Sequence, residues 1–187
     1  RRVAEQLDYA HPPLPVQFDL GVRQIELDIF DDPDGGKYAA PPGESYPNLP
    51  DDPVMRIPGF KVLHQPGVDT NSTCLTLKAC LTLVREWSDA HPGHVPIAVY
   101  LEAKDAAFGP DRLARLEAEI RSVIPRRQLL TPDDVRTALQ QQNQQVAAGQ
   151  IGAPPGPEGL AFQFTISVAG RLDEAAAFEA IVVKTGT

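Results

Sequence analysis

The stretch Arg23-Gln-Ile-Glu-Leu-Asp-Ile-Phe30 decides the fold class. Apolar and polar residues alternate strictly along it: one phase holds Ile25, Leu27 and Ile29, and the other holds Gln24, Glu26 and Asp28. This alternation predicts a β-strand with one buried face and one polar face. Glu26 and Asp28 would lie about 6–7 Å apart along the strand, close enough for both carboxylates to reach one cation. On the strand alone, the alternative is an edge strand whose acidic face is solvated.

Further elements follow at spacings that predict an α/β chain. Strands are expected at residues 60–64, 96–105, 160–168 and 181–184, and helices at 16–20, 77–87, 110–124, from 131 onward and at 171–180. The helix at 110–124 is expected to bury a stripe of Leu113, Leu116, Ile120, Val123 and Ile124. Because strands and helices alternate, parallel pairing with helices outside the sheet is expected.

The loop at 31–58 is long and rich in turn residues, and it directly follows the acidic strand. A loop of this length without periodicity favours a functional rim around a site. Asp31, Asp32 and Asp34 within it have the composition of a plain turn.

The three clearest strands carry polar residues of one pleat phase near their carboxyl ends. These are Glu26 and Asp28 on the first, His64 on the second, and Glu102 and Lys104 on the third. In a β/α barrel the chemistry lies at the carboxyl ends of the strands. The five side chains are therefore expected to share one mouth, and Tyr100, in the same phase as Glu102, is expected to fill a barrel interior.

Composition narrows the classes of partner and compartment. The net charge of −8 argues against non-specific nucleic-acid binding, and no apolar run reaches the length of a transmembrane helix. The chain opens as if inside a helix, which predicts a fragment of a longer product. Cys74 and Cys80 form either a local disulfide, which would indicate export, or two buried thiols.

Six stretches together carry a resemblance to a known family. They are Tyr9-Ala-His-Pro-Pro-Leu14, Leu20-Gly-Val-Arg-Gln-Ile-Glu-Leu-Asp-Ile-Phe30, Pro58-Gly-Phe-Lys-Val-Leu-His64, Trp87-Ser-Asp-Ala-His-Pro-Gly-His94, Glu102-Ala-Lys-Asp105 and Leu130-Thr-Pro-Asp-Asp-Val135. They resemble the calcium-dependent phosphoinositide-specific phospholipase C family of the bacterial and fungal type, within the phospholipase C-like phosphodiesterases. The resemblance is dense over residues 9–136 and thin beyond them.

The resemblance implies a TIM-like (β/α) barrel that is incomplete, with its first strand missing. Residues 1–187 would then be one partial barrel, with a polar and Pro/Gly linker at 140–159. By motif, Glu26, Asp28 and Glu102 match the Ca²⁺ carboxylates and His64 matches the second catalytic histidine. Lys104 stands where a substrate-contacting lysine would lie.

The activity implied by the resemblance is Ca²⁺-dependent cleavage of phosphatidylinositol-type lipids at a membrane surface. The products would be an inositol (cyclic) phosphate and diacylglycerol, and the compartment would be secreted or extracytoplasmic. The family's first strand ends in a His-Asn block, and this chain has no His-Asn pair. Low turnover is therefore expected of the chain alone, because the loss of a catalytic acid or base costs about 10²–10⁴-fold.

Two alternatives remain open from the sequence. A glycerophosphodiester phosphodiesterase shares the Glu-x-Asp arrangement, although its histidine would follow a smaller hairpin. A catalytically silent remnant could bind inositol phosphates or a protein partner. His11, His91 and His94 flank proline or glycine and are expected to be structural.

Overall fold

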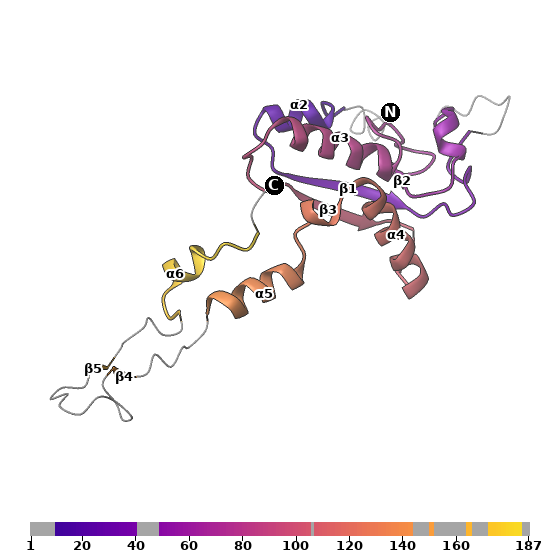
Figure 1. Cartoon of the computed structure of the whole chain (residues 1–187). Coiled ribbons are helices and arrows are strands. Elements are labelled where there is room, and N and C mark those ends of the chain that lie inside the picture. The colour runs from indigo at the N-terminus through magenta and orange to yellow at the C-terminus, as the bar shows by residue number, and fades with distance from the viewer. Residues whose placement is uncertain are drawn as a thin grey trace. The chain divides into compact units, whose positions relative to one another are not determined.

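The computed structural model of the protein describes residues 10–40, 49–105, 107–143, 150–151, 164–165 and 172–184. The chain divides into two compact units, Arg1–Gln128 and Leu129–Thr187 (Figure 1). The single partial barrel over 1–187 stays a prediction. Most of the expected linker at 140–159 lies outside the described residues.

The first unit contains a three-stranded sheet in the order β2-β1-β3. Strand β1 covers Gln24–Phe30, β2 covers Lys61–Val62 and β3 covers Ala98–Ala103. β1 and β3 run parallel, as expected, from Gln24 opposite Ala98 to Ile29 opposite Ala103. β2 runs antiparallel to β1, so the prediction of parallel pairing is wrong for this strand. The chain returns to β1 through a loop, and an antiparallel return needs no crossover helix.

Three α-helices accompany the sheet among the residues of the first unit that the structure describes. They are α2 (Leu14–Asp19), α3 (Leu77–Ala90) and α4 (Pro110–Val123), with short 3-10 helices at Pro53–Arg56 and Arg126–Gln128. Figure 1 shows α2 and α3 side by side along the sheet, and α3 also contacts α4. The α/β class predicted from the sequence is confirmed, and the described strands of this unit form a small mixed sheet.

Helix α3 forms where the sequence predicts it. The Thr76 side chain caps its first turn by accepting a hydrogen bond from the Ala79 backbone N–H at 3.2 Å. Its buried residues recur at helical spacing and include the expected Leu77, Leu81 and Trp87. Burial of this stripe, together with the apolar phase of β1, makes the core of the unit.

Helix α4 buries the predicted Val123, and the predicted Ile124 just after it is also buried, but the rest of the predicted stripe is not fully buried. Leu113, expected in the core, is 51% exposed, whereas Arg112 and Glu119 are buried. The Glu119 carboxylate accepts a hydrogen bond from the Phe60 backbone N–H at 3.1 Å, and Arg112 forms an ion pair with Asp31. These polar contacts turn α4 so that part of its charged face points inward.

The loop after β1 contributes to the core in its described parts. Tyr38, Ala39 and Met55 pack with Phe30 and Leu63 in one buried cluster. The expectation of a functional rim therefore gives way, at these positions, to a packing role.

The acidic start of that loop is also buried, so the plain-turn interpretation is wrong for Asp31 and Asp32. The Asp31 carboxylate pairs with Arg112 and Arg115 of α4. The Asp32 carboxylate lies 3.1 Å from the ammonium of Lys61, whose side chain is fully buried. Buried carboxylates need such partners because desolvation of an unpaired charge is costly.

The second unit contains α5 (Pro132–Gln142), α6 (Ala175–Glu179) and two short strands, β4 (Gln150–Ile151) and β5 (Phe164–Thr165). β4 and β5 pair antiparallel, and the rest of the expected strand at 160–168 lies outside the described residues. α5 begins with a capping box in which Thr131 and Asp134 satisfy each other's backbone N–H.

The expected strand at 181–184 is absent, since no strand is described there. Val182 hydrogen-bonds the Gln142 side chain through both its N–H and its carbonyl, rather than pairing with another strand. None of the described helices combines the length and the apolar character that a membrane span requires.

Candidate metal site at the strand ends

The register of β1 against β3 brings three carboxylates together. Asp28 lies opposite Glu102, and Glu26 lies opposite Tyr100 one pleat earlier. One carboxylate oxygen from each of Glu26, Asp28 and Glu102 lies within 4.8 Å of the others. Two oxygens that are both bound to one Ca²⁺, each at about 2.4 Å, can be at most about 4.8 Å apart. The three side chains therefore fit a shared hard cation.

The electrostatics of the cluster also favour a divalent ion. Burial raises the pKa of the Asp28 carboxyl; the Lys104 ammonium opposes this rise, and the neighbouring Glu102 carboxylate adds to it. Three carboxylates and one ammonium leave a local charge of about −2, which a divalent cation would neutralise.

Lys104 lies beside the cluster, as the sequence predicts. Its backbone N–H donates to the Ile29 carbonyl at 3.1 Å, so the pairing of β1 with β3 continues one residue beyond the strand. Its ammonium nitrogen lies 3.5 Å from Asp28 Oδ2 and 3.4 Å from Glu102 Oε1. In this structure Lys104 thus pairs with two of the three candidate ligands.

His64 follows β2, and its side chain is 46% exposed. The Leu63 backbone N–H donates to the Asp28 carbonyl at 3.3 Å, which places the end of β2 beside the acidic end of β1. Among the described contacts, none joins the His64 ring to the three carboxylates. Its Nδ1 lies 2.9 Å from Asp69 Oδ2.

Asp69 was not predicted from the sequence. A turn brings it back to His64, because the Asp69 N–H donates to the Gln65 carbonyl at 2.9 Å and the Gln65 N–H donates to the Asp69 carbonyl at 2.8 Å. The signal available in the sequence was the Gln65-Pro-Gly67 turn, which lies between His64 and an acid five residues after it. A carboxylate at this position can orient the imidazole ring by a hydrogen bond.

Asp105, which was not predicted as a site residue, connects the ends of β1 and β3. Asp105, just after β3, accepts a hydrogen bond from the Asp31 backbone N–H at 3.2 Å. Its carboxylate also pairs with Arg112, which in turn pairs with Asp31. This network fixes the exits of β1 and β3 relative to each other, and so it supports the geometry of the acidic cluster.

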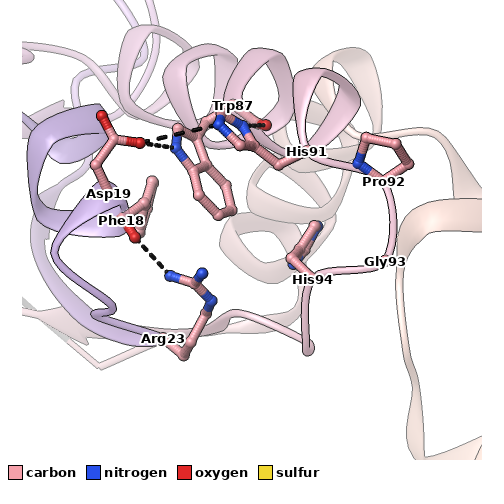
Figure 2. A pocket seen from close by; sticks show the side chains of 8 residues that line it. All are labelled: Phe18, Asp19, Arg23, Trp87, His91, Pro92, Gly93 and His94. Atoms are coloured by element: carbon pink, nitrogen blue, oxygen red, sulfur yellow. Dashed lines mark hydrogen bonds and ion pairs between the residues drawn. The ribbon is translucent and has the colours of Figure 1, made fainter.

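A shallow pocket near the starts of β1 and β3 has a different character (Figure 2). It is lined by Phe18, Asp19, Arg23, Trp87, His91, Pro92, Gly93 and His94. The Arg23 guanidinium lies over the Trp87 ring at 4.6 Å, and His91 stacks on the same ring at 4.2 Å.

The histidines of this pocket hold the turn together. His91 Nδ1 lies 2.7 Å from the Trp87 carbonyl, and His94 Nε2 lies 2.7 Å from the Ser88 hydroxyl. These contacts are those of structural residues, in agreement with the expectation for the turn.

Fold and site together define an α/β protein in which two parallel strands, β1 and β3, carry three carboxylates that could hold a metal ion. The family model described as "Phosphoinositide phospholipase C, Ca2+-dependent" matches residues 1–152. Because the match covers most of the chain, the chain belongs to this family. The family resemblance predicted from the sequence is thereby confirmed, and the expected Ca²⁺ agrees with the family's description and with the acidic cluster.

Solved structures of one relative are similar in part. The calcium-dependent phosphoinositol-specific phospholipase C from a Gram-negative Pseudomonas species, apo crystal form 2, is 26% identical with a TM-score of 0.48. The myo-inositol complex of that protein is 27% identical with a TM-score of 0.48. Each match covers 73% of this chain and 42% of that protein.

Curated relatives of another kind match a shorter segment. Toluene efflux pump membrane transporter TtgB and multidrug/solvent efflux pump membrane transporter MepB, both of Pseudomonas putida, are each 46% identical over 55 residues. That segment is 29% of this chain and 5% of each transporter. The chain thus resembles two kinds of protein, and it spans well under half of the length of both.

Proposed function

We propose that the chain acts in Ca²⁺-dependent cleavage of phosphatidylinositol-type lipids, releasing an inositol (cyclic) phosphate and diacylglycerol. The observation that carries the proposal is the convergence of Glu26, Asp28 and Glu102 at the ends of β1 and β3, in a chain of the calcium-dependent phospholipase C family. Oxygen ligands from carboxylates are those that Ca²⁺ prefers.

Each residue has a chemical role in this proposal. Calcium, when bound by the three carboxylates, would neutralise phosphate charge and lower the pKa of the inositol 2-hydroxyl. The hydroxyl oxygen attacks phosphorus, its proton passes to a base, and the bond from phosphorus to the glycerol oxygen breaks. Protonated His64, oriented by Asp69, donates the proton that the leaving glycerol oxygen takes up.

The sheet supports a barrel as the complete architecture. The polar face of β1 and β3 would line a barrel interior. Tyr100 on this face is 61% exposed, since no part of the chain that the structure describes covers it. We propose that further strands of a β/α barrel cover this face, and that one of them supplies the base.

The substrate indicates where the site would act, and a disulfide indicates the compartment. A phosphoinositide headgroup presents its phosphodiester at a membrane surface, so the site would act there. Cys74 and Cys80 form a disulfide with their Cα atoms 5.1 Å apart, and the open choice between a disulfide and two thiols is thus resolved. Disulfides persist in oxidising compartments, which supports a secreted or extracytoplasmic protein.

The test incubates the purified chain with phosphatidylinositol in mixed micelles and, separately, with glycerophosphocholine, each with Ca²⁺ or with a chelator. Inositol phosphate is expected only from phosphatidylinositol and only with Ca²⁺. Its rate should be about 10²–10⁴-fold below that of a two-histidine enzyme, since the chain offers one catalytic histidine.

The other outcomes decide between the alternatives. Glycerol phosphate released from glycerophosphocholine would favour a glycerophosphodiester phosphodiesterase. Ca²⁺ binding without product from either substrate would favour a silent binding remnant. A rate equal to that of a complete family enzyme would contradict the expected impairment.

A further inference from the structure

Lys104 occupies a position that its predicted role in substrate contact does not explain. Its side chain is 26% accessible, and its ammonium lies 3.5 Å from Asp28 Oδ2 and 3.4 Å from Glu102 Oε1. Both carboxylates belong to the group of three that can hold a metal ion. A monovalent cation of the chain itself thus pairs with two of the oxygens that a Ca²⁺ ion would use.

We propose that Lys104 is an internal counter-ion that holds Asp28 and Glu102 together until a divalent cation displaces it. Without a cation at this place, the carboxylates on neighbouring parallel strands would repel each other across the register that pairs them. The lysine side chain is a point charge on a flexible four-carbon stem, so it can leave the carboxylates without a change in the backbone.

The exchange sets the calcium affinity of the site. Ca²⁺ must compete with the ammonium for two of its ligands, so the apparent affinity is lower than that of the same carboxylates alone. The inference rests on the proposed calcium site and adds a regulator to it.

The first test measures Ca²⁺ binding by calorimetry in wild type and in Lys104→Met, which keeps the length of the stem and removes the charge. About two- to fivefold tighter binding is expected, the size of effect for the loss of a partly exposed competing pair. Lys37→Met is the matched control, because Lys37 pairs with Asp105 at 3.9 Å rather than with the three carboxylates. The control should change the affinity less than twofold.

The second test needs no enzymatic activity. An amine-acetylating reagent, with mass spectrometry of each lysine, should modify Lys104 several-fold faster when Ca²⁺ is present, because displacement releases the ammonium. Exposed Lys78 serves as the internal standard. Equal labelling of Lys104 with and without Ca²⁺ would overturn the inference.

The outcomes separate this inference from the proposed function. If neither wild type nor Lys104→Met binds Ca²⁺, the calcium site itself fails. If wild type binds Ca²⁺ and Lys104→Met binds it equally or more weakly, only the counter-ion role fails.

A second inference concerns Leu129–Thr187 and stands on separate observations. Within this unit the Gln142 side chain donates to the Val182 carbonyl at 2.7 Å and accepts from the Val182 N–H at 3.2 Å. The Lys184 ammonium donates to the Leu129 carbonyl at 2.6 Å. Hydrogen bonds therefore connect the regions at both ends of α5 with the stretch at 172–184 of the same unit.

The division of the chain into two compact units places the boundary after Gln128. The phospholipase C motifs thin out after residue 136. The phospholipase C family match extends to residue 152, so the boundary rests on the contacts. We infer that Leu129–Thr187 is a module of its own, which unfolds independently of residues 1–128.

Two probes in the full chain test this independence. Trp87 is the single tryptophan and belongs to the first unit, so its fluorescence reports the unfolding of that unit alone. Hydrogen exchange of the α5 amides reports the second unit. Gln142→Ala should lower α5 protection about three- to tenfold and leave the Trp87 urea midpoint unchanged, and Gln141→Ala, the control, should change neither.

Two results would overturn the second inference. One is a parallel shift of the Trp87 midpoint and of α5 protection in Gln142→Ala, which would show one cooperative unit. The other is an absence of α5 protection in the wild-type protein.

Discussion

Replacement of Lys61 by methionine should strongly destabilise the first unit. The Lys61 side chain is fully inaccessible, and its ammonium lies 3.1 Å from the Asp32 carboxylate, which is 2% accessible. The ammonium also donates to the carbonyls of Ile57 at 2.7 Å and Gly59 at 3.0 Å. Lys61→Met would leave a buried carboxylate and two carbonyls without this donor.

The expected cost follows from the burial of the pair. Loss of one partner from a buried ion pair costs about 3–5 kcal/mol, whereas total stabilities are about 5–15 kcal/mol. With a urea m-value of about 2 kcal/mol per M, the midpoint of Trp87 fluorescence should fall by about 2 M.

Two further variants test the reasoning. Lys61→Met combined with Asp32→Leu should recover most of the loss, because no unpaired charge remains in the core. Arg121→Ala removes an exposed pair with Glu117 and should cost about 0.5 kcal/mol or less. A Lys61→Met protein within 0.5 kcal/mol of wild type, or a double variant no more stable than the single one, would refute the argument.

Three more predictions concern pH, the disulfide and the histidine. Burial raises the pKa of the Glu119 carboxyl above its ordinary value of 4.5, so wild type should lose stability as the pH rises from 4.5 through that raised pKa. The urea midpoint of Glu119→Gln should depend less on pH over the same range, and a pH dependence equal to that of wild type would contradict this. Replacement of Cys74 and Cys80 by serine should cost about 2 kcal/mol, because the short loop is then no longer constrained in the unfolded chain; an unchanged thermal midpoint would speak against it. Asp69→Asn should shift the imidazole ¹⁵N resonances of His64, its partner at 2.9 Å, and leave those of the other three histidines in place; a spectrum identical to wild type would show that Asp69 does not orient the ring.

The parts of the fold that were predictable from the sequence have strong periodic signals. The alternation over residues 23–30 predicted β1, and the polar phase that Glu102 shares with Asp28 predicted that the two would lie at one mouth; the parallel register of β1 and β3 places them opposite each other. The apolar repeat from Leu77 to Trp87 predicted α3 in the same way. Such signals are local, so one sequence is sufficient to detect them.

The errors arise where distant partners decide the outcome. Arg112 and Glu119 are charged, and a periodicity argument assigns charged residues to the solvent face, yet Asp31 and the Phe60 N–H draw them inward. Asp32 has turn composition locally and is buried because Lys61 neutralises it. Nothing in the two residues of β2 specifies a direction, so its antiparallel pairing could not be predicted.

The most direct measurement is a calorimetric titration of the chain with Ca²⁺, in wild type, in Glu26→Gln and in Glu117→Gln. Glu117 is an exposed helix residue paired with Arg121, so its variant matches the charge change outside the site. We expect one Ca²⁺ per chain with a Kd of about 0.1–1 mM, as in extracellular calcium modules. Affinity should fall at least tenfold in Glu26→Gln, with unchanged circular dichroism, and stay at the wild-type value in Glu117→Gln. Wild-type affinity in Glu26→Gln, or no binding in the wild-type protein, would contradict the assignment of these carboxylates as calcium ligands.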